Sequence, residues 1–82
     1  MTMLQINKIY SIRHRQHYPS AVAITIGYCV GIYTQSNQKP SYDICTNDRY
    51  EYVRISEADI LDIEELTDQE FQKFQKFQEI YT

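Results

Sequence analysis

The sequence predicts a mainly β domain that ends in a single α-helix. The strongest indication is a run of strict alternation over residues 21–33, in which every second position carries a large apolar side chain: Val22, Ile24, Ile26, Tyr28, Val30 and Ile32. Period-2 alternation is typical of a β-strand. Shorter alternating segments on both sides are separated by turn-forming residues. A complete set of helix start signals then appears at Thr67.

The first half of the chain is expected to hold two strands. Residues 8–15 alternate, with Tyr10 and Ile12 on one side, and residues 16–20 contain Pro19 and are predicted to form a loop. Residues 21–33 are long for one strand, and Gly27 and Gly31 lie where a strand can bulge or bend. A long strand bent in this way can serve two sheets at once, as a small barrel requires.

The next segment predicts a hairpin and a closing strand. Residues 34–40 form a turn region, and a strand over 41–46 follows with Tyr42 and Ile44 on one face. A tight turn at 47–49 leads to the partner strand at 50–55. Ser56 is an N-cap for one helical turn over 56–59, since its hydroxyl can accept from the backbone amide three residues on. Residues 60–63 make a last short strand.

The C-terminal helix is the best-specified element. Thr67 is the N-cap, Glu70 completes a capping box, and Leu66 and Phe71 occupy the positions of a hydrophobic staple. At about 100° per residue, one stripe of the helix is aromatic and consists of Phe71, Phe74, Phe77 and Tyr81. We expect this stripe to pack across an open end of the barrel. The alternative is that it forms a homodimer or docks into a partner's groove.

This order of elements resembles the SH3-like small β-barrel. The most similar part is residues 41–63, where a hairpin, a one-turn helix and a closing strand follow one another as in Tudor-like and KOW-like barrels. The resemblance covers residues 8–63 and implies a five-stranded barrel over residues 1–66, with the helix over 67–82, in a single domain. Peptide-binding SH3 domains use a tryptophan that this chain lacks, so no binding residue is carried over.

Composition places the chain among ordinary globular domains. It has 82 residues, of which 43% are hydrophobic and 23% charged, enough for one domain with one core. No signal peptide and no apolar run of membrane-spanning length is recognised, so a cytoplasmic protein without membrane contact is expected. Cys29 and Cys45 are expected to be buried thiols rather than a disulfide.

Charge is divided unevenly along the chain. Residues 1–50 carry five bases against two acids, and residues 51–82 carry nine acids against three bases, which gives +3 and −6. Six acids fall within residues 59–70 with no base between them. The division suggests one basic and one acidic face. The acidic run is either a docking surface for a basic partner or a solvated edge.

Few residues occur in patterns typical of a catalytic, metal-binding or ligand-binding site. Residues 13–18 place two arginines and two histidines beside an aromatic residue, which suits a phosphate or an acidic partner surface. The spacing of His14, His17, Cys29 and Cys45 does not resemble a metal site. No nucleophile setting or phosphate-binding loop is recognised. The sequence therefore predicts no enzyme, no metal site and no cofactor.

The sequence favours a non-enzymatic protein-binding module that acts as an adaptor, accessory subunit or inhibitor of a larger protein complex. Tyrosines are expected to be the anchors and basic residues to set orientation. The residues expected to bind protein are Arg13, Arg15, His17, Tyr18, Tyr33, Tyr42, Tyr50 and Tyr52. The alternative function is a nucleic-acid-binding accessory protein that uses residues 13–18, although the acidic net charge of −3 makes it the weaker hypothesis.

Overall fold

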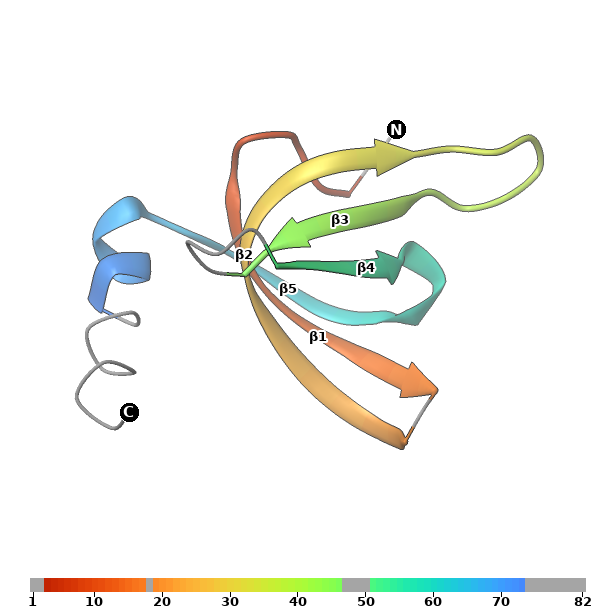
Figure 1. Cartoon of the computed structure of the whole chain (residues 1–82), viewed down its shortest axis with the longest axis horizontal. Coiled ribbons are helices and arrows are strands. Elements are labelled where there is room, and N and C mark those ends of the chain that lie inside the picture. The colour runs from red at the N-terminus through yellow and green to blue at the C-terminus, as the bar shows by residue number, and fades with distance from the viewer. Residues whose placement is uncertain (1–2, 18, 47–50, 74–82) are drawn as a thin grey trace.

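The computed structural model describes residues 3–17, 19–46 and 51–73 (Figure 1). Five strands and a short 3-10 helix follow one another, and residues 68–73 then form helix. The mainly β class with a C-terminal helix is therefore confirmed. The elements are β1 (Ile9–His17), β2 (Ser20–Tyr33), β3 (Ser41–Cys45), β4 (Tyr52–Ser56), η1 (Glu57–Asp59) and β5 (Ile60–Leu66).

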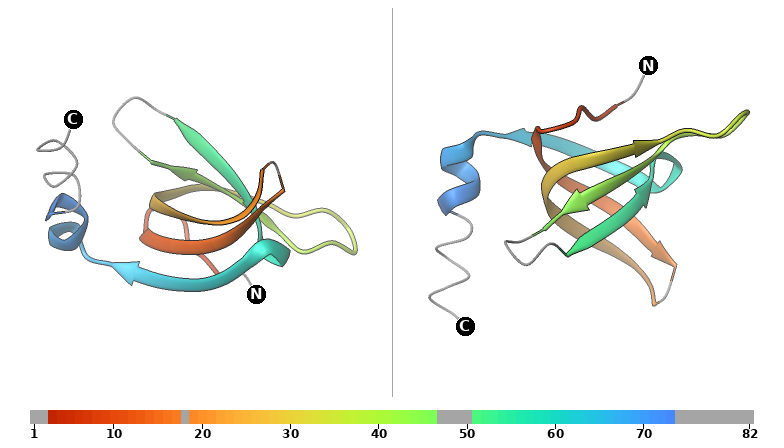
Figure 2. Two further views of the ribbon diagram at one scale, coloured as in Figure 1. Left: turned by 90° about the horizontal axis from the view of Figure 1, so that it is seen from below. Right: turned by 45° about the horizontal axis from the view of Figure 1, so that its top comes forward.

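All five strands belong to one antiparallel sheet in the order β4-β3-β2-β1-β5. The sheet is strongly coiled, as the two views of Figure 2 show. Strands β4 and β5 are its edges, and no pairing joins them in the described part of the chain, so the sheet is not closed. None of the described helical residues forms a helix long and apolar enough to cross a membrane.

Several element boundaries differ from the sequence-based expectation, most of all the ends of β1 and β5. Strand β1 continues through Gln16 to His17, which pairs with Ser20, so residues 16–17 are strand rather than loop. Strand β5 extends to Leu66 because it follows β1 as far as Ile9. Pairing with a neighbouring strand decided both ends, and local sequence contains no signal for it.

Strand β2 bends where its glycines lie. The register with β3 shifts between Cys29 and Gly31, which marks a bulge at this point of the strand. At Gly27 the end of β3 crosses very closely, because a Cβ atom there would lie 2.1 Å from the carbonyl oxygen of Cys45. Only glycine allows this approach. The bend lets β2 pair with β1 along its first part and with β3 from Tyr28 onward.

The core lies on the concave side of the coiled sheet. Along the first part of β2 the inward positions hold small residues, Thr25, Gly27 and Cys29, and the large apolar positions face outward. The other strands supply the bulk of the core. Its fully or almost fully buried members are Leu4, Tyr10, Ile12, Cys29, Tyr42, Ile44 and Ile55.

The segment before β1 contributes to this core. Leu4 is completely buried, and the backbone amide of Gln5 donates to the hydroxyl of Tyr10 at 2.9 Å. The chain then turns at Asn7, whose φ of 69° is one that asparagine tolerates. Its amide donates to the carbonyl of Cys29 at 2.8 Å. Residues 3–8 are thus tied to both the core and β2.

The start of the C-terminal helix agrees with the predicted capping box. The amide of Glu70 donates to the hydroxyl of Thr67 at 3.2 Å, and the amide of Thr67 donates to the Glu70 carboxylate at 3.1 Å. The bond from the backbone amide of Thr67 is the main cause of a lowered pKa of the Glu70 carboxyl. Phe71 is buried and meets Tyr28 edge-on, with ring centroids 5.3 Å apart. The helix therefore begins against the outward side of β2.

Candidate functional site

The most exposed apolar side chains of the sheet lie on the outward side of the β1–β2 hairpin. Val22 and Ile24 have 58% and 66% of their surface exposed. The register places Arg15 opposite Val22 and Arg13 opposite Ile24, and directly opposed residues share one face of a sheet. We call these four residues the hairpin face. Two branched apolar side chains, each opposite an arginine, form an amphipathic surface suited to protein contact.

The hairpin face also adjoins an open strand edge. Strand β3 pairs with β2 only from Tyr28 to Tyr33, so residues 20–27 have β1 as their one neighbouring strand among the described residues. In Figure 1 this first half of β2 forms the lower border of the sheet. An unpaired edge exposes backbone N–H and C=O groups that another chain can bond.

The two arginines of the hairpin face differ in their partners. The guanidinium of Arg13 donates through both Nε, at 2.8 Å, and a terminal nitrogen to one carboxylate oxygen of Asp62 on β5. Arg13, Asp62 and Ile24 contribute to an open depression of about 330 Å³. Arg15 is exposed and forms no ion pair with any described side chain. Arg15 is therefore the cation that this surface offers to a partner.

The acidic run does not form a separate acidic face, because β5 lies beside β1. Three of its six acids pair with basic groups on or next to β1: Glu65 with Lys8 at 3.0 Å, Asp62 with Arg13, and Asp59 with His17 at 3.2 Å. The bond to Glu65 raises the pKa of Lys8. Exposed pairs of this kind contribute little to stability, because solvent screens them. Their larger effect is to neutralise charge that the sequence alone suggested was free.

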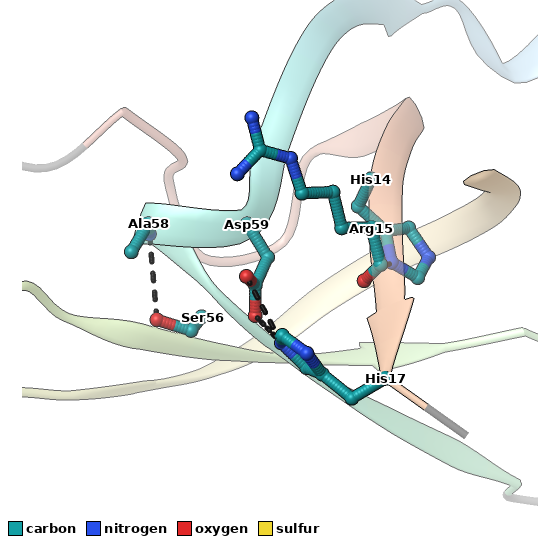
Figure 3. A network of polar contacts seen from close by, with 6 residues as sticks. All are labelled: His14, Arg15, His17, Ser56, Ala58 and Asp59. Carbon is teal, nitrogen blue, oxygen red and sulfur yellow. Dashed lines mark hydrogen bonds and ion pairs between the residues drawn. The ribbon is translucent and has the colours of Figure 1, made fainter. Parts of the chain in front are cut away.

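The two histidines have structural partners (Figure 3). His17 reaches across to the carboxylate of Asp59 at the end of η1. His14 is buried, with Nε2 2.8 Å from the hydroxyl of Thr25 and Nδ1 3.2 Å from the carbonyl oxygen of Arg15. Because a carbonyl only accepts, Nδ1 carries the proton. Figure 3 also shows Ser56 capping η1 through the amide of Ala58, one residue earlier than the position expected.

The tyrosines expected as anchors have different environments. Tyr42 is fully buried, so it belongs to the core and not to a binding surface. Its hydroxyl donates to Glu57 at 2.7 Å and accepts from the amide of Met3 at 3.0 Å. Burial, followed by the bond to Glu57, raises its pKa to about 12. The apolar position of Tyr42 was predicted correctly, and the anchor role assigned to it was wrong.

Tyr33 and Tyr52 remain on the surface. Tyr33, about half exposed, lies under the guanidinium of Arg54, whose central carbon is 4.4 Å from the ring centroid. Arg54 also holds Asp43 through two bonds of 2.8 and 3.2 Å. The Arg54 guanidinium is the main cause of the lowered pKa of Asp43. Tyr52 is exposed at 56% on the edge strand β4.

The remaining expected site residues are Tyr18, Tyr50, Phe74, Phe77 and Tyr81, and they lie outside the described residues. Of the aromatic helix stripe, the structure describes only Phe71, which covers Tyr28. The packing of the stripe across an end of the barrel stays a prediction.

No group of side chains in the described ranges is arranged to hold a metal ion. Cys29 and Cys45 are not joined by a disulfide, and Cys29 is buried while Cys45 is partly buried. Burial raises the pKa of the Cys29 thiol, which favours its protonated form. Another surface depression, of about 460 Å³, lies at the junction of β5 and the helix and is open to solvent.

Sequence reasoning missed Val22 and Ile24 as surface residues. Alternation identifies two faces of a strand but does not say which one is covered. The only available signal was the size of the residues at the alternate positions of the strand. Ala23, Thr25 and Gly27 are small enough to face the interior of a tightly coiled sheet.

Comparison with known proteins gives this chain no relatives: no family model, no curated protein and no solved structure matches it.

Proposed function

We propose that this chain is a small non-enzymatic protein-binding module that acts as an adaptor, accessory subunit or inhibitor of a larger protein. The observation that carries the proposal is the exposure of Val22 and Ile24 beside Arg15 on a strand with an open edge. Exposed apolar side chains bordered by charge mark protein interaction sites. The hairpin face replaces the buried Tyr42 as the centre of the proposed interface.

The proposed architecture is an open form of the SH3-like small β-barrel, with residues 1–66 in the barrel and 67–82 in the helix. The strand order supports it, since the fifth strand returns beside the first after four strands in succession. The 3-10 turn between β4 and β5 and the close approach at Gly27 also support it. Such a fold hosts many functions, so the functional proposal rests on the hairpin face alone.

The alternative proposal, nucleic-acid binding through residues 13–18, has less support. Phosphate binding needs several free cations, and Arg13 is already paired with Asp62. This alternative predicts salt-dependent retention on an oligonucleotide, weakened when Arg13 and Arg15 are both replaced by Gln.

The protein-binding proposal is tested by affinity purification with chemical crosslinking from the cells that express the chain. The wild-type chain should capture a specific partner, and the double variant Val22→Lys with Ile24→Lys should lose it. Both positions are exposed, so circular dichroism should show an unchanged fold.

Tyr52→Lys is the matched control, since Tyr52 has a similar exposed fraction and also lies on an edge strand. It should retain the partner. Capture that survives the hairpin variant and is lost with Tyr52→Lys would place the interface on β4. A chain that captures no partner and turns over a small substrate would overturn the proposal.

A further inference from the structure

We propose that the first half of β2 binds an extended, acidic segment of the partner, which adds to the sheet as a further strand along residues 20–26. The inference rests on the proposed protein-binding function and names the chemistry of the partner.

The backbone of this half-strand provides the first argument. Over residues 20–27 β2 pairs with β1 alone, and β3 joins only at Tyr28 opposite Cys45. Ser20, Ala21, Val22 and Ile24 are all exposed, so no described segment covers this edge. Seven residues of strand span about 23 Å at 3.3 Å per residue. An incoming segment of six or seven residues can bond along that length.

The side chains beside this edge determine which apolar residues the bound segment should carry. Val22 and Ile24 project from the same face at alternate positions. An added strand places its own alternate residues directly beside them. Branched apolar residues at those positions would cover the surface that Val22 and Ile24 now expose to water.

The charges near this edge determine which charge the bound segment should carry. Lys8, Arg13 and Arg54 are each paired with a carboxylate, and Arg15 is not paired within the described chain. Arg15 is opposite Val22, so an added strand would lie two strand spacings away from β1, about 10 Å. A glutamate and an extended arginine bridge that distance between them. The segment should therefore be acidic.

A second copy of this chain is the weaker occupant. Two β2 edges in symmetric contact would place valine and isoleucine in the centre with arginines on both sides, and no acid would meet Arg15. Charge complementarity thus favours a different, acidic chain.

The experiment selects a random library of displayed nine-residue peptides against the intact, immobilised chain. Enriched peptides should combine Asp or Glu with Val or Ile at alternate positions. An enriched peptide, once synthesised, should slow hydrogen exchange at every second amide within residues 20–26, because alternate amides point to the open edge.

Variants then separate the apolar contribution to peptide binding from the contribution of charge. The double variant Val22→Lys with Ile24→Lys should abolish binding of that peptide. Arg15→Gln should weaken it about three- to tenfold, the range of a partly exposed charged hydrogen bond. Arg54→Gln, a matched control on another strand, should leave the affinity unchanged.

Other outcomes overturn the inference in distinguishable ways. Basic peptides, peptides without alternation, protection elsewhere in the chain or no enrichment overturn the acidic strand and leave the protein-binding function to its own test. A dimer that Ile24→Lys dissociates and that binds no peptide identifies a second copy as the occupant. Salt-dependent binding of an oligothymidylate that competes with every selected peptide would overturn both proposals.

Discussion

The two halves of β2 carry the same alternation and have opposite surroundings. In the second half, Tyr28 faces outward and is covered by Phe71, and β3 pairs along the strand. In the first half, Val22 and Ile24 face outward without cover, and only β1 pairs with the strand. The same pattern of residues is therefore structural in one half and available for binding in the other. Tertiary neighbours, and not the strand itself, make this difference.

The largest expected effect concerns the bend that separates the two halves. Gly27→Ala should cost at least about 3 kcal/mol in the free energy of unfolding, because the new Cβ would meet the Cys45 carbonyl oxygen at 2.1 Å and backbone must move. Urea denaturation measures this. Gly31→Ala is the control, since its Cβ would meet only the side chain of Tyr33, at 3.0 Å or more. Equal losses at the two glycines would show that the crossing at Gly27 is not close.

The next effect compares the covered and uncovered outward faces. Phe71→Ala should lower the free energy of unfolding by about 2–3 kcal/mol, since it removes a buried ring and its edge-on contact with Tyr28. Ile24→Ala should change it by no more than about 0.5 kcal/mol, because that side chain is already in water. Thermal or urea unfolding of both variants gives the comparison. If Ile24→Ala proves as costly as Phe71→Ala, the hairpin face is not exposed.

A smaller effect concerns the core that Tyr42 anchors. Tyr42→Phe should cost about 1–2 kcal/mol at neutral pH, because the amide of Met3 and the carboxylate of Glu57 both lose a partner. The folded state raises the pKa of Tyr42 from 10.0 to about 12. Its contribution is therefore complete below pH 10 and is lost as the pH rises toward 12.

The measurement is the free energy of unfolding of both proteins from pH 9 to pH 12. Wild type should decline more steeply than Tyr42→Phe above pH 10. Parallel declines would mean that the Tyr42 hydroxyl is not buried in the folded state.

Local signals were enough to predict most elements. The capping box at Thr67 and Glu70 was readable because its bonds join residues three apart. The β3–β4 hairpin was readable because Tyr42 and Ile44 alternate toward the core. The ends of β1 and β5 were not readable, because each depends on a partner distant in sequence.

The candidate site was predicted only in part. Arg13 and Arg15 were identified because basic residues cluster in residues 13–18. The ion pair between Arg13 and Asp62 on β5 then leaves Arg13 unavailable to a partner. Tyr42 was assigned to the surface because tyrosine suits both environments, and its two hydroxyl bonds depend on residues 39 and 15 positions away. The outward orientation of Val22 and Ile24 was indicated only by the small side chains at the alternate positions of the strand, such as Ala23.

The central claim is that the first half of β2 is an uncovered edge, and native-state hydrogen exchange of the free chain tests it most directly. Within residues 20–26, every second amide should exchange rapidly, since it points to solvent, and the amides between them, bonded to β1, should be protected. Within residues 31–33, the amides that donate hydrogen bonds to β3 should be protected from exchange. Uniform protection over residues 20–26 would contradict the account, because it would mean that this edge is already covered.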